Sequence, residues 1–274
     1  MYKTVIIAIA VLFFHTGCGT EAKEAQKRLD KAKALYENHQ FLDAKSVIDS
    51  IHVLFPREVA ARREALALMR LVERGENERN MAYCDSMLPL RISELEKLKK
   101  GFIFEKDPVY DVSGKYIFPA MAVERNIGRS YIRCGVDEEG EMYIASVYYG
   151  SAPLNHTGLT FSTNDGTHAS TPSIPYDGGI NYRFKDMGNT TEVVTYKGNN
   201  CKEIANFLMI INEKERVKAT YTGGKAFSLY LSDNDKKAIR ATYELANTLS
   251  EITALRKEKN RSEKKIRIID EKIN

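Results

Sequence analysis

Residues 232–274 carry a heptad pattern that limits the folds open to this chain. Two interleaved series of side chains recur every seven residues. They are Leu245, Ile252, Lys259, Ile266, Ile273 and Thr248, Leu255, Ser262, Ile269. This spacing predicts one long helix with a coiled-coil seam that is polar at Lys259 and Ser262. We expect the helix to begin at Ser232, whose hydroxyl can cap it. Such a helix must bury its apolar stripe against another element.

Residues 76–102 offer a matching stripe. Apolar side chains step by three or four through Pro89, at Met81, Cys84, Leu88, Ile92, Leu95, Leu98 and Phe102. The pattern predicts a helix kinked at Pro89, or two helices that share one buried face. In an antiparallel pair with the C-terminal helix, Leu245 lies near Leu98. We favour this intramolecular pair over a homodimeric coiled coil, the alternative, because the connecting chain lowers the entropic cost of closure.

Residues 103–231 have the texture of β structure. Tyr, Val, Ile and Thr alternate with polar residues, and Gly-containing turns separate the runs. The expected strands are Lys115–Val123, Ser130–Gly135, Glu141–Tyr149, Gly158–Ser162, Ile180–Phe184, Thr191–Tyr196, Arg216–Thr222 and Ala226–Leu231. One helix is expected at about residues 202–211. This pattern predicts an antiparallel β-sandwich or half-barrel.

Residues 26–102 are rich in Ala, Leu, Glu, Lys and Arg, which is typical of helices. Ala32 and Ala44 are small enough to let two antiparallel helices approach, Phe41 starts the second helix and Pro56 ends it. These positions resemble one tetratricopeptide (TPR) repeat, and a looser second hairpin is expected from Arg57 to about Leu88. The predicted fold class is therefore α+β. TPR-like helical hairpins and a long C-terminal coiled-coil helix, residues 232–274, flank the β domain.

The N-terminus has the pattern of an export signal. Lys3 precedes an apolar run over residues 5–14, which is too short to span a membrane as a helix. The run ends at His15-Thr-Gly-Cys18, which resembles the lipobox of bacterial lipoproteins, although His15 stands where Leu is usual. The resemblance implies that residues 1–17 are a removed signal peptide, that Cys18 is acylated, and that residues 18–25 form a tether. It places the chain in the bacterial cell envelope at the outer membrane, on the periplasmic or the surface face. An ordinary signal peptide followed by an unrelated Cys is the alternative.

Charge is concentrated at one end of the chain. The formal net charge is +4, and residues 256–274 hold eight basic and four acidic side chains. The rest of the chain is near neutral, which argues against nucleic acid as a partner. The basic segment suits anionic lipid head groups or cell-wall polymer, but interspersed acidic residues favour a solvated helix face of mixed charge.

Three cysteines remain besides Cys18. An oxidising envelope allows one disulfide, and Cys134 with Cys201 is the preferred pair because both lie in the central region. Three buried thiols are the alternative. Cys84 lies on the helical stripe, which indicates a place in the core.

No sequence motif for hydrolysis, nucleotide binding or metal binding is present. The best local cluster for chemistry is His156, Asp165 and His168, within residues 150–176. Their spacing fits no known motif, and the surrounding Gly, Ser, Thr and Asn indicate long hairpin loops. We therefore expect no catalytic residue, no metal and no cofactor.

Tyrosines are frequent in the β region, at Tyr131, Tyr143, Tyr148, Tyr149, Tyr182, Tyr196, Tyr221 and Tyr230. Tyr148 and Tyr149 are adjacent, so one of them points away from the core in a regular strand. With Tyr182 and Arg183 they form a candidate patch for a glycan or peptide ligand. Packing of tyrosines within the sheet is the competing interpretation.

These features predict a non-enzymatic envelope lipoprotein that acts as an interaction scaffold or adaptor. The membrane, through the lipid on Cys18, and other envelope proteins are the expected partners. Glycan or peptide binding by the β domain is the alternative, and a hydrolase with residues distant in sequence is a third.

Overall fold

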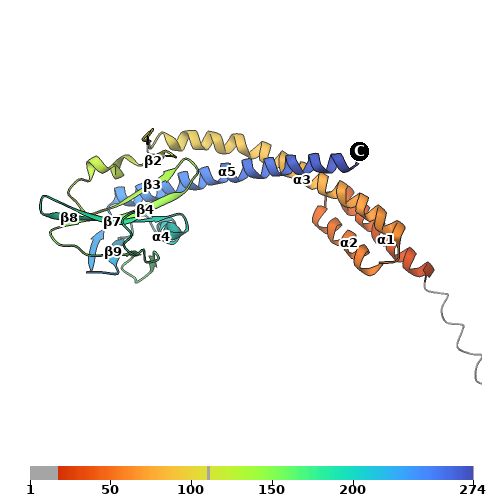
Figure 1. Ribbon diagram of the computed structural model, residues 1–274, viewed down its shortest axis with the longest axis horizontal. Coiled ribbons are helices and arrows are strands. Elements are labelled where there is room, and N and C mark those ends of the chain that lie inside the picture. The colour runs from red at the N-terminus through yellow and green to blue at the C-terminus, as the bar shows by residue number, and fades with distance from the viewer. Residues whose placement is uncertain (1–17, 110–111, 274) are drawn as a thin grey trace, which may run out of the picture. The chain divides into compact units, whose positions relative to one another are not determined.

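The computed structural model describes residues 18–109 and 112–273 (Figure 1). It confirms the α+β class, with N-terminal helices, two antiparallel sheets and a long C-terminal helix. The described chain divides into two compact units. The first comprises the residues up to Met87 together with those from Arg256 onward, and the second comprises Leu88–Leu255.

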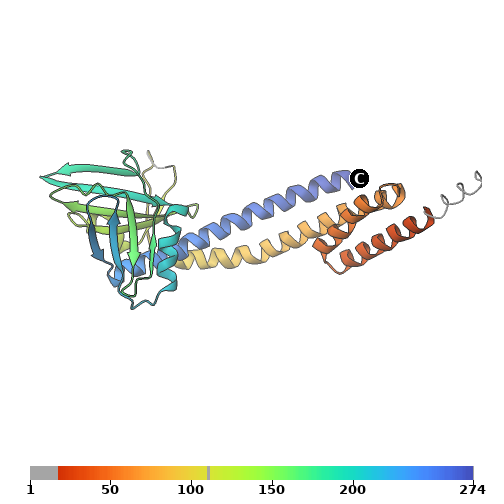
Figure 2. The same ribbon diagram turned by 90° about the horizontal axis from the view of Figure 1, so that it is seen from below.

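In the first unit, α1 (Cys18–Glu37) and α2 (Phe41–Leu54) form an antiparallel hairpin (Figures 1 and 2). Ala32 and Ala44 are fully buried between the helices, and Phe41 packs at the start of α2. The expected first hairpin is therefore present. Residues 18–25, predicted to form a tether, lie in the first turns of α1.

The second hairpin predicted from Arg57 to about Leu88 is not formed. A single helix, α3 (Val59–Lys99), runs through the whole segment with Pro89 inside it. No Gly or Pro breaks the sequence between Val59 and Gly75, and the apolar stripe continues past Pro89. A continuous buried stripe keeps the helix intact because tertiary packing outweighs the local cost of the proline.

The C-terminal helix, α5 (Asp233–Ile273), packs on α3 as an antiparallel partner. In the first unit Arg74 Nε lies 2.8 Å from Asp270 Oδ1. In the second unit Arg91 Nε lies 2.8 Å from Glu251 Oε2, and Leu245 is fully buried. The intramolecular helix pair is thus confirmed. Ser232 caps α5, since its Oγ accepts a hydrogen bond from the Asp235 N–H at 3.1 Å.

The described residues of the second unit form ten strands in two antiparallel sheets, which Figure 2 shows at one end of the helix pair. One sheet has the order β1-β2-β3-β4-β8-β7, and the other has the order β10-β9-β5-β6. The strands are β1 (Ile103–Glu105), β2 (Lys115–Ile117), β3 (Tyr131–Asp137), β4 (Met142–Gly150), β5 (Gly158–Ser162), β6 (His168–Ser170), β7 (Asn181–Asp186), β8 (Asn189–Lys197), β9 (Lys218–Thr222) and β10 (Phe227–Tyr230).

Most predicted strands lie close to observed ones. The strand predicted over Lys115–Val123 is shorter, because Pro119 has no N–H for a ladder and begins the 3-10 turn η1 (Pro119–Met121), which η2 (Val123–Arg125) follows. The predicted helix is α4 (Asn199–Ile210). Two strands of three residues, β1 and β6, carry too short a pattern to be detected.

The two faces of the six-stranded sheet differ in what covers them. Its inner face shares one core with the four-stranded sheet, α4 and α5, as Ile144, Phe161, Leu208 and Ile239 illustrate. On its outer face the described residues form a separate, smaller cluster of side chains that all belong to that sheet. This outer cluster consists of Tyr131, Ala145, Val147 and Val193, with Tyr182 packed against it.

Candidate functional site

The structure does not bring the four predicted patch residues together. Tyr148 faces the core, where its ring packs on Phe227 with centroids 5.1 Å apart and its hydroxyl donates to the Ala152 carbonyl at 3.1 Å. Tyr149 faces outward, and its hydroxyl accepts a hydrogen bond from Asn189. The alternation predicted for this adjacent pair is therefore correct, and it separates the two rings.

The β7 residues are separated in the same way. Tyr182 packs on the outer cluster and stacks with Phe184, with ring centroids 6.4 Å apart. Arg183 is the next residue along the strand. Its guanidinium lies 4.8 Å from the centre of the Tyr176 ring and donates to the Asn155 side chain. Only Tyr149 and Tyr182 of the predicted patch belong to the outer face.

Strand register explains why the outer face is hollowed. One cross-strand row reads Tyr131, Val147, Val193 and Tyr182. The next row reads Arg133, Ala145 and Thr195, and Thr195 N–H donates to the Ile180 carbonyl. Because Ala145 and Thr195 are small, the surface of the sheet is lower along this second row than along the rows on either side of it. We call this depression the outer groove.

The outer groove has a volume of about 210 Å³. It is lined by Lys115, Arg133, Asp137, Glu141, Tyr143, Gly179, Ile180, Thr195 and Lys197. Three of these side chains are cationic and two are anionic. Asp137 is held by the β3–β4 turn, where its Oδ1 accepts the Glu139 and Glu141 N–H groups at 3.0 and 2.7 Å.

Arg133 and Tyr143 form one wall of the outer groove. Tyr143 pairs across the strands with Gly135, and a Cβ on Gly135 would meet the Tyr143 hydroxyl at 2.7 Å. The missing side chain of Gly135 thus lets the tyrosine ring lie across the sheet. The Arg133 guanidinium lies 5.7 Å from the centre of that ring.

The two residues of this wall interact with each other. Arg133 is half-buried, and no described carboxylate forms an ion pair with it. Tyr143 is 7% exposed, and its hydroxyl interacts with the Arg133 guanidinium. Burial raises the pKa of Tyr143, so the hydroxyl stays protonated and can donate. The sequence analysis identified neither residue as part of a site.

A larger hollow in the second unit differs in this respect. It has a volume of about 690 Å³ and lies between the end of α4 and the start of α5. Two of its cations, Lys236 and Arg240, are already bonded to the protein. Lys236 Nζ donates to the carbonyls of Glu213 and Glu215 at 2.6 and 3.1 Å, and Arg240 donates to the carbonyl of Ile211 at 2.8 Å. These side chains hold the chain after α4 onto α5.

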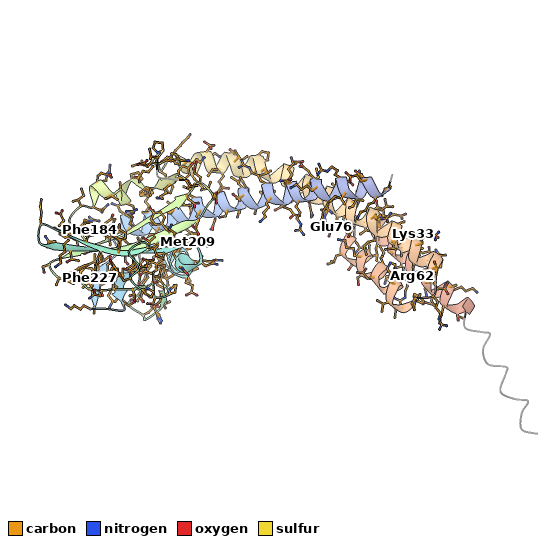
Figure 3. The ribbon with its side chains drawn as sticks, in the orientation of Figure 1. Lys33, Arg62, Glu76, Phe184, Met209 and Phe227 are labelled. Atoms are coloured by element: carbon orange, nitrogen blue, oxygen red, sulfur yellow. The ribbon has the colours of Figure 1, made fainter. Side chains whose placement is uncertain are left out.

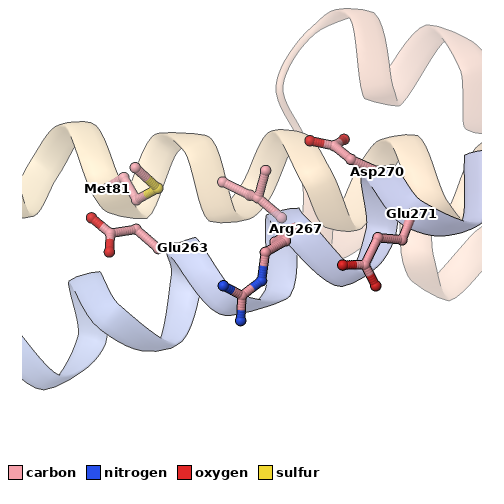
Figure 4. Close-up of a pocket in the computed structure, with 6 residues that line it drawn as sticks. Met81, Glu263, Arg267, Asp270 and Glu271 are labelled. Carbon is pink, nitrogen blue, oxygen red and sulfur yellow. The ribbon is translucent and has the colours of Figure 1, made fainter. Parts of the chain in front are cut away.

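A third hollow lies between α3 and α5 in the first unit. Figure 4 shows Met81 of α3 close to Glu263 of α5, with Arg267, Asp270 and Glu271 further along. Its volume is about 370 Å³. Asp270 already pairs with Arg74, so this hollow is the open edge of the helix pair.

The predicted cluster of His156, Asp165 and His168 is dispersed. Asp165 lies in an exposed turn, where hydrogen bonds from Thr163 and Thr167 lower its pKa. His168 is exposed in β6 and contacts the Gly166 carbonyl. His156 is buried elsewhere. In the described ranges, no group of His, Cys, Asp and Glu is arranged to hold a metal ion.

His156 instead joins two residues that the sequence analysis did not single out. Its Nε2 lies 2.9 Å from Ser146 Oγ, and its Nδ1 lies 2.9 Å from Glu192 Oε2. Glu192 also accepts the Asn155 N–H at 3.0 Å. A serine, a histidine and a carboxylate in this order resemble a nucleophile with its base and orienting acid.

Burial determines what this trio can do. Ser146, His156 and Glu192 are 0, 1 and 3% exposed. Ser146 lies in the middle of β4 and is paired on both sides, with Ile132 and Val194. A substrate carbonyl has no path to its Oγ, so the trio satisfies buried polar groups in the core. One sequence signal marks Ser146 and Glu192, because both are polar at positions in phase with inward apolar residues.

All three remaining cysteines are free thiols, so the predicted Cys134–Cys201 disulfide is not formed. Cys134 Sγ lies 3.5 Å from Thr242 Oγ1, and Cys201 Sγ donates to the Met142 carbonyl at 3.4 Å. Burial raises the pKa of Cys134 to about 12 and that of Cys201 to about 11. Each thiol is therefore a buried, protonated group with its own partner, which is the alternative expected from the sequence.

The predicted signal peptide, residues 1–17, lies outside the described residues, as does the side chain of Cys18. Among the helices that the structure describes, none has the length and apolar character needed to cross a membrane. The basic end of α5 is partly paired, since Lys259 Nζ lies 2.6 Å from Asp85 Oδ1.

Comparisons of the chain with protein-family models, with curated proteins and with solved structures found no match.

Proposed function

We propose that this chain is a non-enzymatic lipoprotein of the bacterial envelope that binds a partner through the outer face of its six-stranded sheet. The lipid on Cys18 would hold it to the outer membrane, on the periplasmic or the surface face. The partner would be another envelope protein. The chain would thus act as an interaction scaffold or adaptor.

The single observation that carries the proposal is the outer face of the six-stranded sheet, where the described residues form a separate apolar cluster beside an exposed aromatic ring. The outer cluster buries Tyr131, Val147 and Val193 using only side chains of the same sheet. Beside it, Phe184 on β7 is 51% exposed (Figure 3). Aromatic side chains bordered by arginines are enriched where proteins bind partners, because they combine large apolar area with polar contacts.

The finer description of the fold also supports an interaction role. The α1–α2 hairpin is similar to a TPR unit, with Ala32, Phe41 and Ala44 in its core. The two sheets share one core in the manner of a sandwich. Both architectures are used for binding in many proteins. This support is an analogy with those proteins.

Site-specific photocrosslinking in the native envelope tests the proposal. A photoreactive amino acid replaces Phe184, and the matched control replaces Ile210, which is 79% exposed at the end of α4. We expect defined envelope proteins crosslinked from position 184 and not from position 210. Equal crosslinking from both positions, or none from 184, would contradict an interface on this face.

Ligand binding by the β domain is the second candidate function, with a glycan or a peptide as ligand. The outer groove favours it, because a depression with a half-buried arginine is a small-ligand feature rather than a flat interface. Crosslinking from position 184 to glycan or to a short peptide, instead of to a folded protein, would identify this case.

A further inference from the structure

We infer that the free edge of β7 binds an extended segment of the partner protein, in which two acidic residues flank an apolar one. The segment adds a strand to the six-stranded sheet, with its acidic residues opposite Arg183 and Lys185. The inference deepens the proposed function and rests on it, because it names the part of the sheet that the partner meets and the chemistry of the partner segment.

β7 is the longest edge strand of the two described sheets. It has six residues, whereas the other edge strands, β1, β6 and β10, have three, three and four. In the described chain β8 is the only strand that pairs with it. Its residues from Arg183 to Asp186 are exposed. The unpaired backbone groups of an edge strand are a template for another strand, so β7 is the edge best suited to a partner.

The hydrogen-bond pattern shows which backbone groups of β7 point outward. Thr195 N–H donates to the Ile180 carbonyl at 2.8 Å, so these two residues form a hydrogen-bonded pair. Hydrogen-bonded and non-hydrogen-bonded pairs alternate along antiparallel strands. The backbone groups of Asn181, Arg183 and Lys185 therefore point away from β8.

Asn181 shows this orientation directly, and its own outward groups are already bonded. Its carbonyl accepts the N–H groups of Asp177 and Gly178 at 3.2 and 3.0 Å, and its N–H donates to Asp177 Oδ1 at 2.9 Å. No described strand lies beside the next two outward positions, Arg183 and Lys185. These positions offer two N–H groups and two carbonyls, which can pair with two residues of an added strand.

The side chains of β7 define what the added strand carries. Successive residues of a strand point to opposite faces. Tyr182, Phe184 and Asp186 therefore share the outer face, where the first two rings are stacked. Arg183 and Lys185 lie on the opposite side. Opposite charges and aromatic–aliphatic pairs across strands are stabilising, so an acidic residue fits opposite each cation and an apolar residue fits opposite Phe184.

The described contacts of the two cations leave room for these carboxylates. The Arg183 guanidinium contacts the Tyr176 ring and donates to the Asn155 side chain, and neither of these groups is anionic. Glu192 is opposite Arg183 across the strands, but its carboxylate is buried and accepts the Asn155 N–H. Lys185 is exposed.

The same charges argue against a second copy of the chain as the occupant. When two β7 strands pair antiparallel about a two-fold axis, the outward positions oppose each other. Arg183 of one copy then lies opposite Lys185 of the other. Like charges directly opposite each other are destabilising, so the edge favours an acidic segment over its own copy.

Fluorescence anisotropy of dye-labelled peptides with the full chain, purified in detergent, tests the inference. The first peptide is acetyl-Thr-Val-Glu-Val-Glu-Val-Thr-amide, and the second has Lys in place of both Glu residues. We expect saturable binding of the Glu peptide and binding of the Lys peptide that is about tenfold weaker or less.

Backbone methylation separates strand pairing from simple attraction of charges. In the added strand the N–H groups of the two Glu residues point toward β7, and those of the Val residues point away. Methyl groups on both Glu nitrogens are therefore expected to abolish binding. Methyl groups on two of the Val nitrogens are the matched control, and we expect them to change the affinity by less than about threefold.

Reversal of the charges on β7 locates the site. The double variant Arg183→Glu, Lys185→Glu is expected to bind the Glu peptide about tenfold more weakly than the parent chain, and to bind the Lys peptide more tightly than the parent does. The control is the double variant Lys218→Glu, Lys225→Glu, which changes the net charge equally at exposed positions in and beside β9. We expect this control to leave both affinities unchanged.

Three results would overturn the inference: no saturable binding of the Glu peptide, equal binding of the two methylated peptides, or an unchanged affinity after charge reversal on β7. If a photoreactive residue at position 185 joined two copies of the chain, the edge would belong to a second copy. These failures differ from failure of the proposed function. Crosslinking of envelope proteins from position 184 would persist if the partner binds the outer face without adding a strand. Binding of the Glu peptide would persist even if no envelope protein is crosslinked.

Discussion

The thiols of Cys134 and Cys201 show how burial sets the chemistry of single residues. Burial raises their pKa values to about 12 and about 11, from an ordinary value of 9.0. Both thiols ionise near the ordinary value in the unfolded chain. Their contribution to stability is therefore complete below about pH 9 and is lost as the pH rises toward their folded pKa values.

We predict that the free energy of unfolding falls as the pH rises above 9, by up to about 1.4 kcal/mol per pH unit for each thiol. Urea denaturation in the presence of a reductant, at several values between pH 7 and 10, measures this slope. Cys201→Ala should reduce the slope, and Glu203→Ala, at an exposed site on the same helix, should not. An unchanged slope in Cys201→Ala would refute the assignment.

The Ser146–His156–Glu192 trio has a structural role in our interpretation, which leads to a second residue-scale prediction. Glu192→Ala removes the acceptor of the His156 ring and of the Asn155 N–H. We expect a loss of about 2–4 kcal/mol in the free energy of unfolding, because buried donors then lack partners. Urea denaturation measures it, with the exposed Glu203→Ala as the control.

A stability change below about 0.5 kcal/mol for Glu192→Ala would contradict the structural role. At this scale the sequence predicts alternation well, as the opposite orientations of Tyr148 and Tyr149 show. It does not predict which polar side chains meet inside the core. That outcome depends on the register between β4 and β8, which places Ser146 opposite Val194 and near Glu192.

At the scale of elements, periodicity predicted the long helices and most strands. It did not predict the three-residue strands β1 and β6. The strand predicted over Gly158–Ser162 has the same bounds as β5. The prediction of a second N-terminal hairpin was wrong because its expected turn lies within α3. No residue there interrupts the continuous apolar stripe of the helix. Pro89 within α3 remains the element-scale feature with the clearest energetic consequence.

Pro89→Ala is expected to stabilise the protein by about 1–3 kcal/mol. The proline removes one backbone hydrogen bond from α3 and crowds the preceding turn, and alanine restores both. Because Pro89 is exposed, the smaller side chain leaves no cavity. Thermal unfolding followed by circular dichroism measures the change, with exposed Ser86→Ala in the same helix as the control. A lower Tm for Pro89→Ala would show that α3 requires the proline.

At the scale of the whole molecule, the candidate site depends on features that no local pattern reveals. The outer groove combines Arg133 of β3, Tyr143 of β4 and Thr195 of β8, which are far apart in sequence. Only the pairing order β3-β4-β8 brings them together. The sequence analysis identified the outward tyrosines Tyr149 and Tyr182, but the arginine it chose, Arg183, alternates to the other side of β7.

The last prediction concerns the proposed attachment of the chain to the envelope. The proposed attachment rests on acylation of Cys18, which the lipobox-like sequence before it suggests. Each buried methylene contributes about 0.8 kcal/mol, and stable anchoring needs two acyl chains. We expect the chain expressed in a bacterium to partition into the detergent phase of Triton X-114. Cys18→Ala should move it to the aqueous phase, while Cys84→Ala should leave it in the detergent. Retention of Cys18→Ala in the detergent phase would show that something other than this lipid attaches the protein. A parent chain in the aqueous phase would favour an ordinary signal peptide over residues 1–17.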